Sequence, residues 1–237
     1  MVEPAAGPVL VLLPGSSGDA TGWDDLVGRL DPALELFVVR AELRGQGESW
    51  PPPAPETGRI ETFSDDVVAL LDALVIESFY VGGKSIGGMV SVDMLRVCPE
   101  RILGVISMEG FTHHSVLDDA FGGDMFSTLN QQQQRELSEA TERRRQRWTQ
   151  AHKDEFNEIW KRWERGYEIL SHTDKPVLEI WGDRGRERPS RKALQLPERD
   201  NIELTWIPGT SHAFISEAPD LSAQLINDFI RRTRQAL

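Results

Sequence analysis

A G-x-S-x-G pentapeptide, residues 83–87, lies between a short apolar run and a helical pattern. Residues 78–82 are β-prone and apolar, and residues 88–97 have the composition of a buried helix. A strand, this pentapeptide and a helix in that order are typical of a nucleophile elbow, a tight turn that presents a serine hydroxyl above a sheet. The glycines are needed because the backbone is strained and the strand and helix approach closely. The pattern predicts a nucleophilic Ser85, and a plain glycine-rich turn is the structural alternative.

Strand and helix patterns alternate along most of the chain, with short connections between them. Apolar runs predict strands at residues 9–13, 34–41, 78–82, 102–108, 176–181 and 202–207. Amphipathic patterns predict helices at residues 21–30, with Thr21 as N-cap, and at 62–75, 88–97 and about 217–232. This alternation predicts an α/β fold in which a mostly parallel sheet of about six strands has helices on both faces.

The alternation is interrupted between residues 111 and 173, which contain no strand candidate. We therefore expect a core formed by residues 1–110 and 174–237, with residues 111–173 inserted as a helical lid over the carboxyl edge of the sheet, where open α/β sheets bind ligands. Aromatic residues recur there at helical spacing, and they either pack the lid or wall a substrate pocket. They include Trp160 and Trp163. A run of arginines at residues 143–147 lies among glutamates and indicates a solvated helix face.

The composition of the chain excludes or disfavours several classes of partner, location and site. The formal net charge of -12 disfavours nucleic acid or an anionic membrane as a partner. No apolar run approaches the roughly 20 residues that span a bilayer, and no signal peptide is recognisable, so a cytoplasmic location is expected. Cys98 is the single cysteine, which excludes an intrachain disulfide. The adjacent His113 and His114 lack further spaced ligands, so no metal is expected. Oligomeric state does not follow from the sequence.

A nucleophilic serine needs a base, and the base needs an acid that fixes its tautomer. His212 follows the last predicted strand and is the best-placed of the five histidines. Asp183 directly follows the strand before it, which gives the chain order serine, acid, histidine found in one class of hydrolases. Glu109 ends a neighbouring strand and competes for the acid role. The sequence favours Asp183 as the acid and Glu109 as a pocket residue.

Such a site also needs two backbone N–H groups that stabilise an oxyanion. The amide of Ile86, next to the nucleophile, is one candidate. The other candidate is Ser16, in the glycine-rich loop 14–18 after the first strand, with Ser17 as an alternative. A plain strand-to-helix turn would be the structural reading of this loop.

Together these motifs resemble the α/β-hydrolase fold family, in particular its small, lidded esterases and lactonases. The resemblance runs over nearly the whole chain except residues 111–173. It rests on Leu13-Pro14-Gly15 with Trp23, on Leu43-Arg44-Gly45-Gln46-Gly47-Glu48-Ser49, and on residues 83–88, 181–183 and 209–212. Three residues depart from the family pattern: Pro14 and Glu42 stand where the family usually has histidine and aspartate, and Lys84 is unusual before the nucleophile. Lys84 either perturbs the electrostatics of the elbow or points into solvent, and the sequence favours solvent.

The resemblance implies a serine hydrolase that cleaves a small, fairly apolar carboxylic ester or lactone through an acyl-enzyme, without a cofactor. Two alternatives stay open. One is a non-hydrolytic enzyme on the same fold, such as a hydroxynitrile lyase, a cofactor-free oxygenase or a perhydrolase. The other is a ligand-binding protein with vestigial activity. Relatives that use a nucleophilic aspartate are disfavoured because Ser85 occupies that position.

Overall fold

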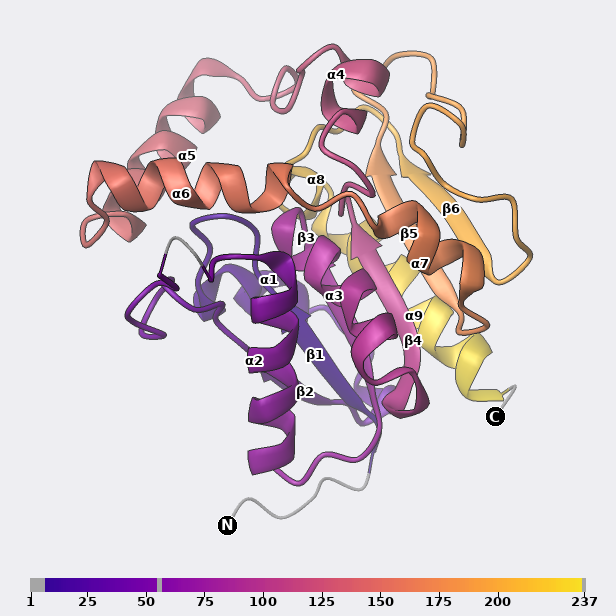
Figure 1. Ribbon diagram of the computed structural model, residues 1–237. Helices are drawn as coiled ribbons and strands as arrows, with labels where there is room; N and C mark the ends of the chain where they lie inside the picture. The colour runs from indigo at the N-terminus through magenta and orange to yellow at the C-terminus, as the bar shows by residue number, and fades with distance from the viewer. Residues whose placement is uncertain (1–6, 55–56, 236–237) are drawn as a thin grey trace.

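The computed structural model describes residues 7–54 and 57–235, and one six-stranded sheet forms its centre (Figure 1). All the strands pair in parallel, in the order β2-β1-β3-β4-β5-β6. The strands are β1 (Val9–Leu13), β2 (Phe37–Arg40), β3 (Phe79–Lys84), β4 (Ile102–Met108), β5 (Val177–Gly182) and β6 (Ile202–Ile207). The predicted α/β fold and its sheet of about six strands are confirmed. Because the strands are parallel, the loops that follow them meet at one edge of the sheet.

Helices cover both faces of this sheet. One face carries α2 (Ile60–Ala73), α3 (Ile86–Val97) and α7 (Gly166–His172), and the opposite face carries α1 (Asp24–Val27), α8 (Phe214–Glu217) and α9 (Pro219–Gln235). Short 3₁₀ turns occupy Ala20–Trp23, Pro32–Leu34 and Pro99–Arg101. No helix of the described residues is long and apolar enough to cross a membrane.

Two elements near the N-terminus differ from the predicted ones. The helix predicted at 21–30 is a 3₁₀ turn followed by the four residues of α1, and its N-cap is Asp19 rather than Thr21. The Asp19 carboxylate accepts the amides of Thr21 and Gly22, as an N-cap aspartate does. Strand β2 is shorter than predicted because Leu34 still belongs to a 3₁₀ turn, which Glu35 ends in the left-handed region at φ 53°.

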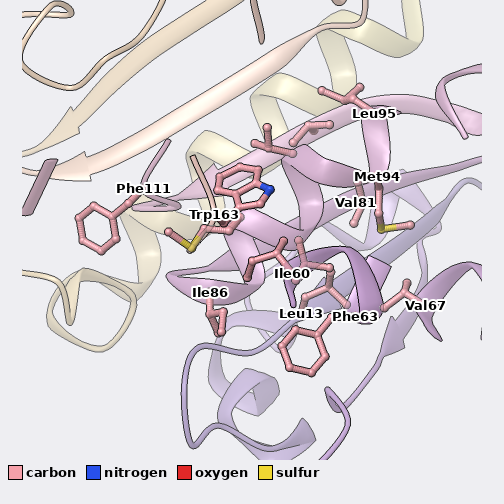
Figure 2. Packing of buried hydrophobic residues seen from close by; sticks show 14 of the residues in the cluster. Leu13, Ile60, Phe63, Val67, Val81, Ile86, Met94, Leu95, Phe111 and Trp163 are labelled. Carbon is pink, nitrogen blue, oxygen red and sulfur yellow. The ribbon is translucent and has the colours of Figure 1, made fainter. Parts of the chain in front are cut away.

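The apolar core on the α2–α3 face extends into the segment between β4 and β5. Figure 2 shows Trp163 of that segment and Phe111 among core residues such as Ile86 and Met94. Phe156 of the same segment packs on Phe63 of α2, with 5.6 Å between the ring centroids. The segment is therefore fastened to the sheet domain by buried aromatic side chains.

Residues 111–173 form four helices and no strand. The first three are α4 (Val116–Phe121), α5 (Gln131–Arg144) and α6 (Gln150–Lys161), and α7 completes the set. Figure 1 shows α4, α5 and α6 at the end of the molecule toward which β4 and β5 point. Asn130 and Thr149 form capping boxes that begin α5 and α6. Helix α6 buries Phe156 and Ile159, whereas α5 has no buried residue.

Candidate active site

Ser85 occupies a strained turn between β3 and α3. Its φ of 55° and ψ of -121° lie in a region that residues other than glycine rarely adopt. The glycines on either side allow the close approach: a Cβ at Gly83 would lie 2.1 Å from the carbonyl oxygen of Gly87, and one at Gly87 would lie 2.3 Å from that of Leu13. Ser85 is half-buried, and its amide donates to the Met108 carbonyl, 2.9 Å away. The local geometry is that of the predicted elbow.

His212 pairs with Glu109 at the same edge of the sheet. Its Nδ1 lies 2.7 Å from Glu109 Oε2, and both side chains are buried. Nδ1 is therefore the atom that donates to the carboxylate, which leaves Nε2 as the ring nitrogen that can accept a proton. Glu109 directly follows β4 and itself has a positive φ of 49°. The chain thus places an oriented imidazole at the edge of the sheet where β3 and the Ser85 turn also end.

Arg184 holds the other side of the Glu109 carboxylate. Its two terminal nitrogens contact the two carboxylate oxygens, with Nη2 2.9 Å from Oε2, and the Gly182 amide donates to Oε1 at 2.9 Å. Burial alone would raise the pKa of Glu109, but the bonds and charges of His212 and Arg184 outweigh it and lower the pKa to about 2. Glu109 is therefore ionised at any pH at which the protein would work. The sequence analysis missed Arg184, although a cation two residues after a strand end is a visible signal.

Asp183 does not contact His212, so the predicted pairing of these residues is wrong. The Asp183 carboxylate instead accepts the amides of Gly185 at 2.9 Å and Gly209 at 2.7 Å, and it faces Arg188. Burial would raise the pKa of Asp183, but these backbone and side-chain bonds lower it. The prediction fails because the Asp183 side chain points toward these two amides, and it thereby links the loop that follows β5 to the loop that follows β6. Asp183 thus supports the loop that carries His212.

Aromatic side chains hold the His212 ring on two sides. Phe111 stacks on it with centroids 5.7 Å apart and an interplanar angle of 18°, and Phe126 meets it edge-on at 5.8 Å. The His212 amide donates to the Met125 carbonyl at 2.8 Å. Phe111, Met125 and Phe126 belong to the segment between β4 and β5, so this segment contacts the candidate base directly. None of the three was identified from the sequence.

The two candidate oxyanion donors lie on the loops expected for them. Ile86 begins α3, where backbone N–H groups have no partner within the helix. Ser16 and Ser17 form a turn closed by the Gly18 amide and the Gly15 carbonyl at 2.9 Å, with Ser17 at φ 64°. Among the described residues, the Ser16 amide makes no hydrogen bond. A Cβ at Gly15 would lie 3.4 Å from Ser85 Cβ, which places this turn against Ser85.

The remaining predicted site residues differ in how close they lie to His212. Trp160 packs on Phe111 at 6.3 Å, one ring removed from His212. Trp163 is 2% exposed, and its Nε1 donates to Asp93 of α3 at 3.4 Å, so it packs in the core. Lys84 is half-buried rather than free in solvent, and burial lowers its pKa against the opposing charges of Glu109 and Glu217.

The His113–His114 pair gains a third potential metal ligand in the structure, Glu164. Ligand atoms of the three residues lie within 4.8 Å of one another, and His113 Nε2 is 3.3 Å from the Glu164 carboxylate. However, the Ser115 amide donates to His113 Nδ1 at 3.1 Å, so the ring proton resides on Nε2. That nitrogen faces the carboxylate as a donor, whereas the buried His114 Nδ1 has no hydrogen-bond partner among the described residues.

Comparison with known proteins agrees with this architecture. Residues 8–184 match the family described as alpha/beta hydrolase fold, and the chain therefore belongs to that family. The dihydrolipoyllysine-residue acetyltransferase component of the acetoin cleaving system of Pseudomonas putida is 36% identical over 106 residues, 44% of this chain and 28% of that protein. The chain thus spans less than a third of that relative.

Solved structures of low sequence identity share the fold over nearly the whole chain. The enol-lactonase from Burkholderia xenovorans LB400 has a TM-score of 0.72 at 20% identity, covering 95% of this chain and 92% of that one. A thermophilic esterase from Thermogutta terrifontis has a TM-score of 0.70 at 21% identity, covering 97% and 91%.

Burial lowers the pKa of His212, although the bond and charge of Glu109 raise it; the charges of Lys84 and Arg184 act with burial. Desolvation by burial is the largest of these effects, so the pKa of His212 is lowered overall. A histidine base works only when neutral, so activity should rise with pH through this pKa. We expect the acid limb of kcat/KM to have its midpoint below about 6.5, the ordinary histidine value. A midpoint above neutrality in a pH–rate profile would contradict this prediction.

Proposed function

We propose that this protein is a serine hydrolase of small carboxylic esters or lactones that works through an acyl-enzyme. The observation that carries the proposal is the buried His212–Glu109 hydrogen bond at the sheet edge that also carries Ser85 on a strained elbow. In this proposal Glu109 takes the acid role assigned to Asp183 from the sequence. Ser85, His212 and Glu109 then form the triad, and the amides of Ile86 and Ser16 form the oxyanion hole.

The proposed reaction has two halves. His212 Nε2 takes the Ser85 proton as the hydroxyl oxygen attacks the ester carbonyl, and the oxyanion is stabilised by the two amides. The intermediate collapses when His212 returns the proton to the leaving alkoxide, which departs as an alcohol or, for a lactone, stays tethered. Water, deprotonated by His212, then attacks the acyl-enzyme, and His212 returns that proton to the Ser85 oxygen as the acyl–oxygen bond breaks and the acid is released. Glu109 stabilises the imidazolium throughout without taking a proton, as its low pKa requires.

The lactonase and the esterase with the same fold support this reaction class, although each activity is a property of that protein. Within the proposal, residues 1–110 and 174–237 are the catalytic core and residues 111–173 are a lid. Two contacts support the lid assignment: Phe111 lies on His212, and Trp160 lies on Phe111. A substrate chain that leaves the triad on this side would meet Trp160 before the more buried Trp163.

A panel of p-nitrophenyl esters from acetate to octanoate, with a few lactones, tests the proposed function. We expect turnover of members of the panel by the wild-type protein. Trp160→Ala should lower kcat/KM for the octanoate more than for the acetate, because a long acyl chain contacts the lid and a two-carbon chain barely does.

Trp163→Ala is the matched control for this lid prediction. It should lower the stability by about 3–5 kcal/mol, as truncating a buried aromatic residue does, while leaving the octanoate-to-acetate ratio nearly unchanged. No turnover of any ester or lactone by folded protein would overturn the proposed function. Equal losses on both esters in Trp160→Ala would overturn the role given to Trp160.

A further inference from the structure

Arg145, at the end of α5, turns inward onto the loop beside the nucleophile. Its Nε donates to Ser17 Oγ, and its Nη2 lies 3.4 Å from Ser16 Oγ. The guanidinium also lies over the Trp148 ring, 5.3 Å from the centroid. The residue is half-buried, in contrast to the solvated helix face predicted for this arginine run. A residue of the helical segment 111–173 thus contacts the turn that offers the Ser16 amide.

Arg145 differs from the neighbouring arginines because no acidic side chain pairs with it among the described residues. Arg144 pairs with Asp19 at 2.8 Å, and Arg147 faces Glu48 at 3.9 Å. Within residues 7–54 and 57–235, the Arg145 side chain makes no ion pair, and besides the Trp148 ring it contacts two neutral hydroxyls. Burial lowers the pKa of Arg145, and the charge of Glu142 opposes that effect only in part.

A guanidinium has five N–H donors in a planar fork that matches a carboxylate. Taking such a cation partly out of water is costly unless an anion compensates it. Arg145 is close to the reaction centre, because it contacts the turn of Ser16 and Ser17, and Gly15 at the start of that turn lies against Ser85. An anion that completed the Arg145 fork would therefore lie within the reach of a small substrate acylating Ser85.

We propose that Arg145 binds an anionic group of the substrate, so that the preferred substrates are esters or lactones carrying a carboxylate. This inference rests on the proposed function and narrows its substrate class. The net charge of -12 makes such selectivity dependent on a local cation, because the overall field repels anions. The acid group would form a charge-assisted, two-pronged hydrogen bond with Arg145, and the reacting carbonyl would lie at Ser85.

The test compares two esters of matched length, mono-4-nitrophenyl adipate and 4-nitrophenyl hexanoate, after subtraction of spontaneous hydrolysis. The wild-type protein should have the higher kcat/KM for the adipate ester. Arg145→Met should lower kcat/KM for the adipate ester by about 10- to 100-fold, as expected for the loss of a charged hydrogen bond. Its kcat/KM for the hexanoate ester should fall by a smaller factor, because that ester has no acid group for Arg145 to bind. Arg145→Lys should have a kcat/KM for the adipate ester between those of the wild type and Arg145→Met, because an ammonium keeps the charge but lacks the planar fork of donors.

Arg147→Met is the matched control, since Arg147 is an exposed arginine two residues away that already faces Glu48. It should leave the adipate-to-hexanoate ratio unchanged. Equal losses on both esters in Arg145→Met would overturn the proposal and reduce Arg145 to a residue that fastens α5 to the Ser16–Ser17 turn. A wild-type protein that hydrolyses both esters without preferring the adipate would also overturn it.

Binding to the Ser85→Ala variant separates this inference from the proposed function. Monomethyl adipate should bind that variant in a calorimetric titration, and adding Arg145→Met should weaken binding by about 10-fold or more. Arg145-dependent binding without ester turnover by the wild-type protein would overturn the hydrolase and leave the anion site standing. Turnover without Arg145-dependent binding would overturn the anion site alone.

Discussion

Replacing Ser85 by alanine should lower ester turnover by about 10⁴- to 10⁶-fold, the range that removal of a serine nucleophile causes. Ser85 is half-buried and its side chain is small, so the loss of the hydroxyl removes chemistry and little packing. The alanine also has to adopt the φ of 55° that Ser85 already tolerates, which adds no new strain. The stability of the fold should therefore be nearly unchanged, and turnover of the p-nitrophenyl panel measures the effect.

Labelling by a fluorophosphonate probe provides an independent measurement of the same residue. The wild-type protein should be labelled at Ser85, and the Ser85→Ala variant should not react. Ser78→Ala is the matched control, because Ser78 is exposed just before β3 and lies away from the elbow. Undiminished activity in Ser85→Ala, or labelling that persists at another serine, would contradict the assignment of the nucleophile.

The fold could be predicted from the sequence because most of its strands are recognisable as short apolar runs. Strands β1, β4 and β6 have the predicted bounds, since parallel strands covered on both faces appear as continuous apolar runs that begin and end abruptly. The elbow was predictable for the same local reason: Gly83 and Gly87 are required by contacts between neighbouring segments of the chain. Polar segments such as residues 20–30 were less predictable, because an aspartate just before the segment, Asp19, sets where the turn begins.

The site was predictable only as far as local sequence determines it. Ser85 and His212 were predicted from their positions after β3 and β6, but which carboxylate pairs with His212 depends on which way two side chains turn at adjacent strand ends. Glu109 turns toward His212 because Arg184, from the loop after the next strand, holds its second side. That interaction joins residues 75 positions apart and leaves no periodic signal in the chain. The inward turn of Arg145 is hidden for a similar reason, because its partners are 128 and 129 positions away.

If Glu109 rather than Asp183 is the acid that orients His212, Glu109→Gln should cause the second large loss of activity. The amide removes the charge that stabilises the imidazolium and can present its NH₂ to His212, which would favour the wrong tautomer. A loss of about 10³- to 10⁴-fold in kcat is expected, as for an aspartate-to-asparagine change in a triad. Asp183→Asn should cost less than about 10-fold, because that carboxylate contacts Gly185, Gly209 and Arg188 and not the imidazole.

Stability has to be measured alongside activity, because Glu109→Gln also leaves Arg184 buried without its counter-ion. Breaking one side of such a pair commonly costs about 3–5 kcal/mol, whereas a catalytic loss should appear even in the folded fraction. Titration of reactive Ser85 by the fluorophosphonate gives the concentration of competent protein, to which kcat is then normalised. If the normalised kcat of Glu109→Gln stays near that of the wild type while Asp183→Asn loses several orders of magnitude, the acid resides after β5 and the His212–Glu109 hydrogen bond only supports the loop. If both variants lose activity equally, the two carboxylates act as one unit through the loop that carries Gly209 and His212.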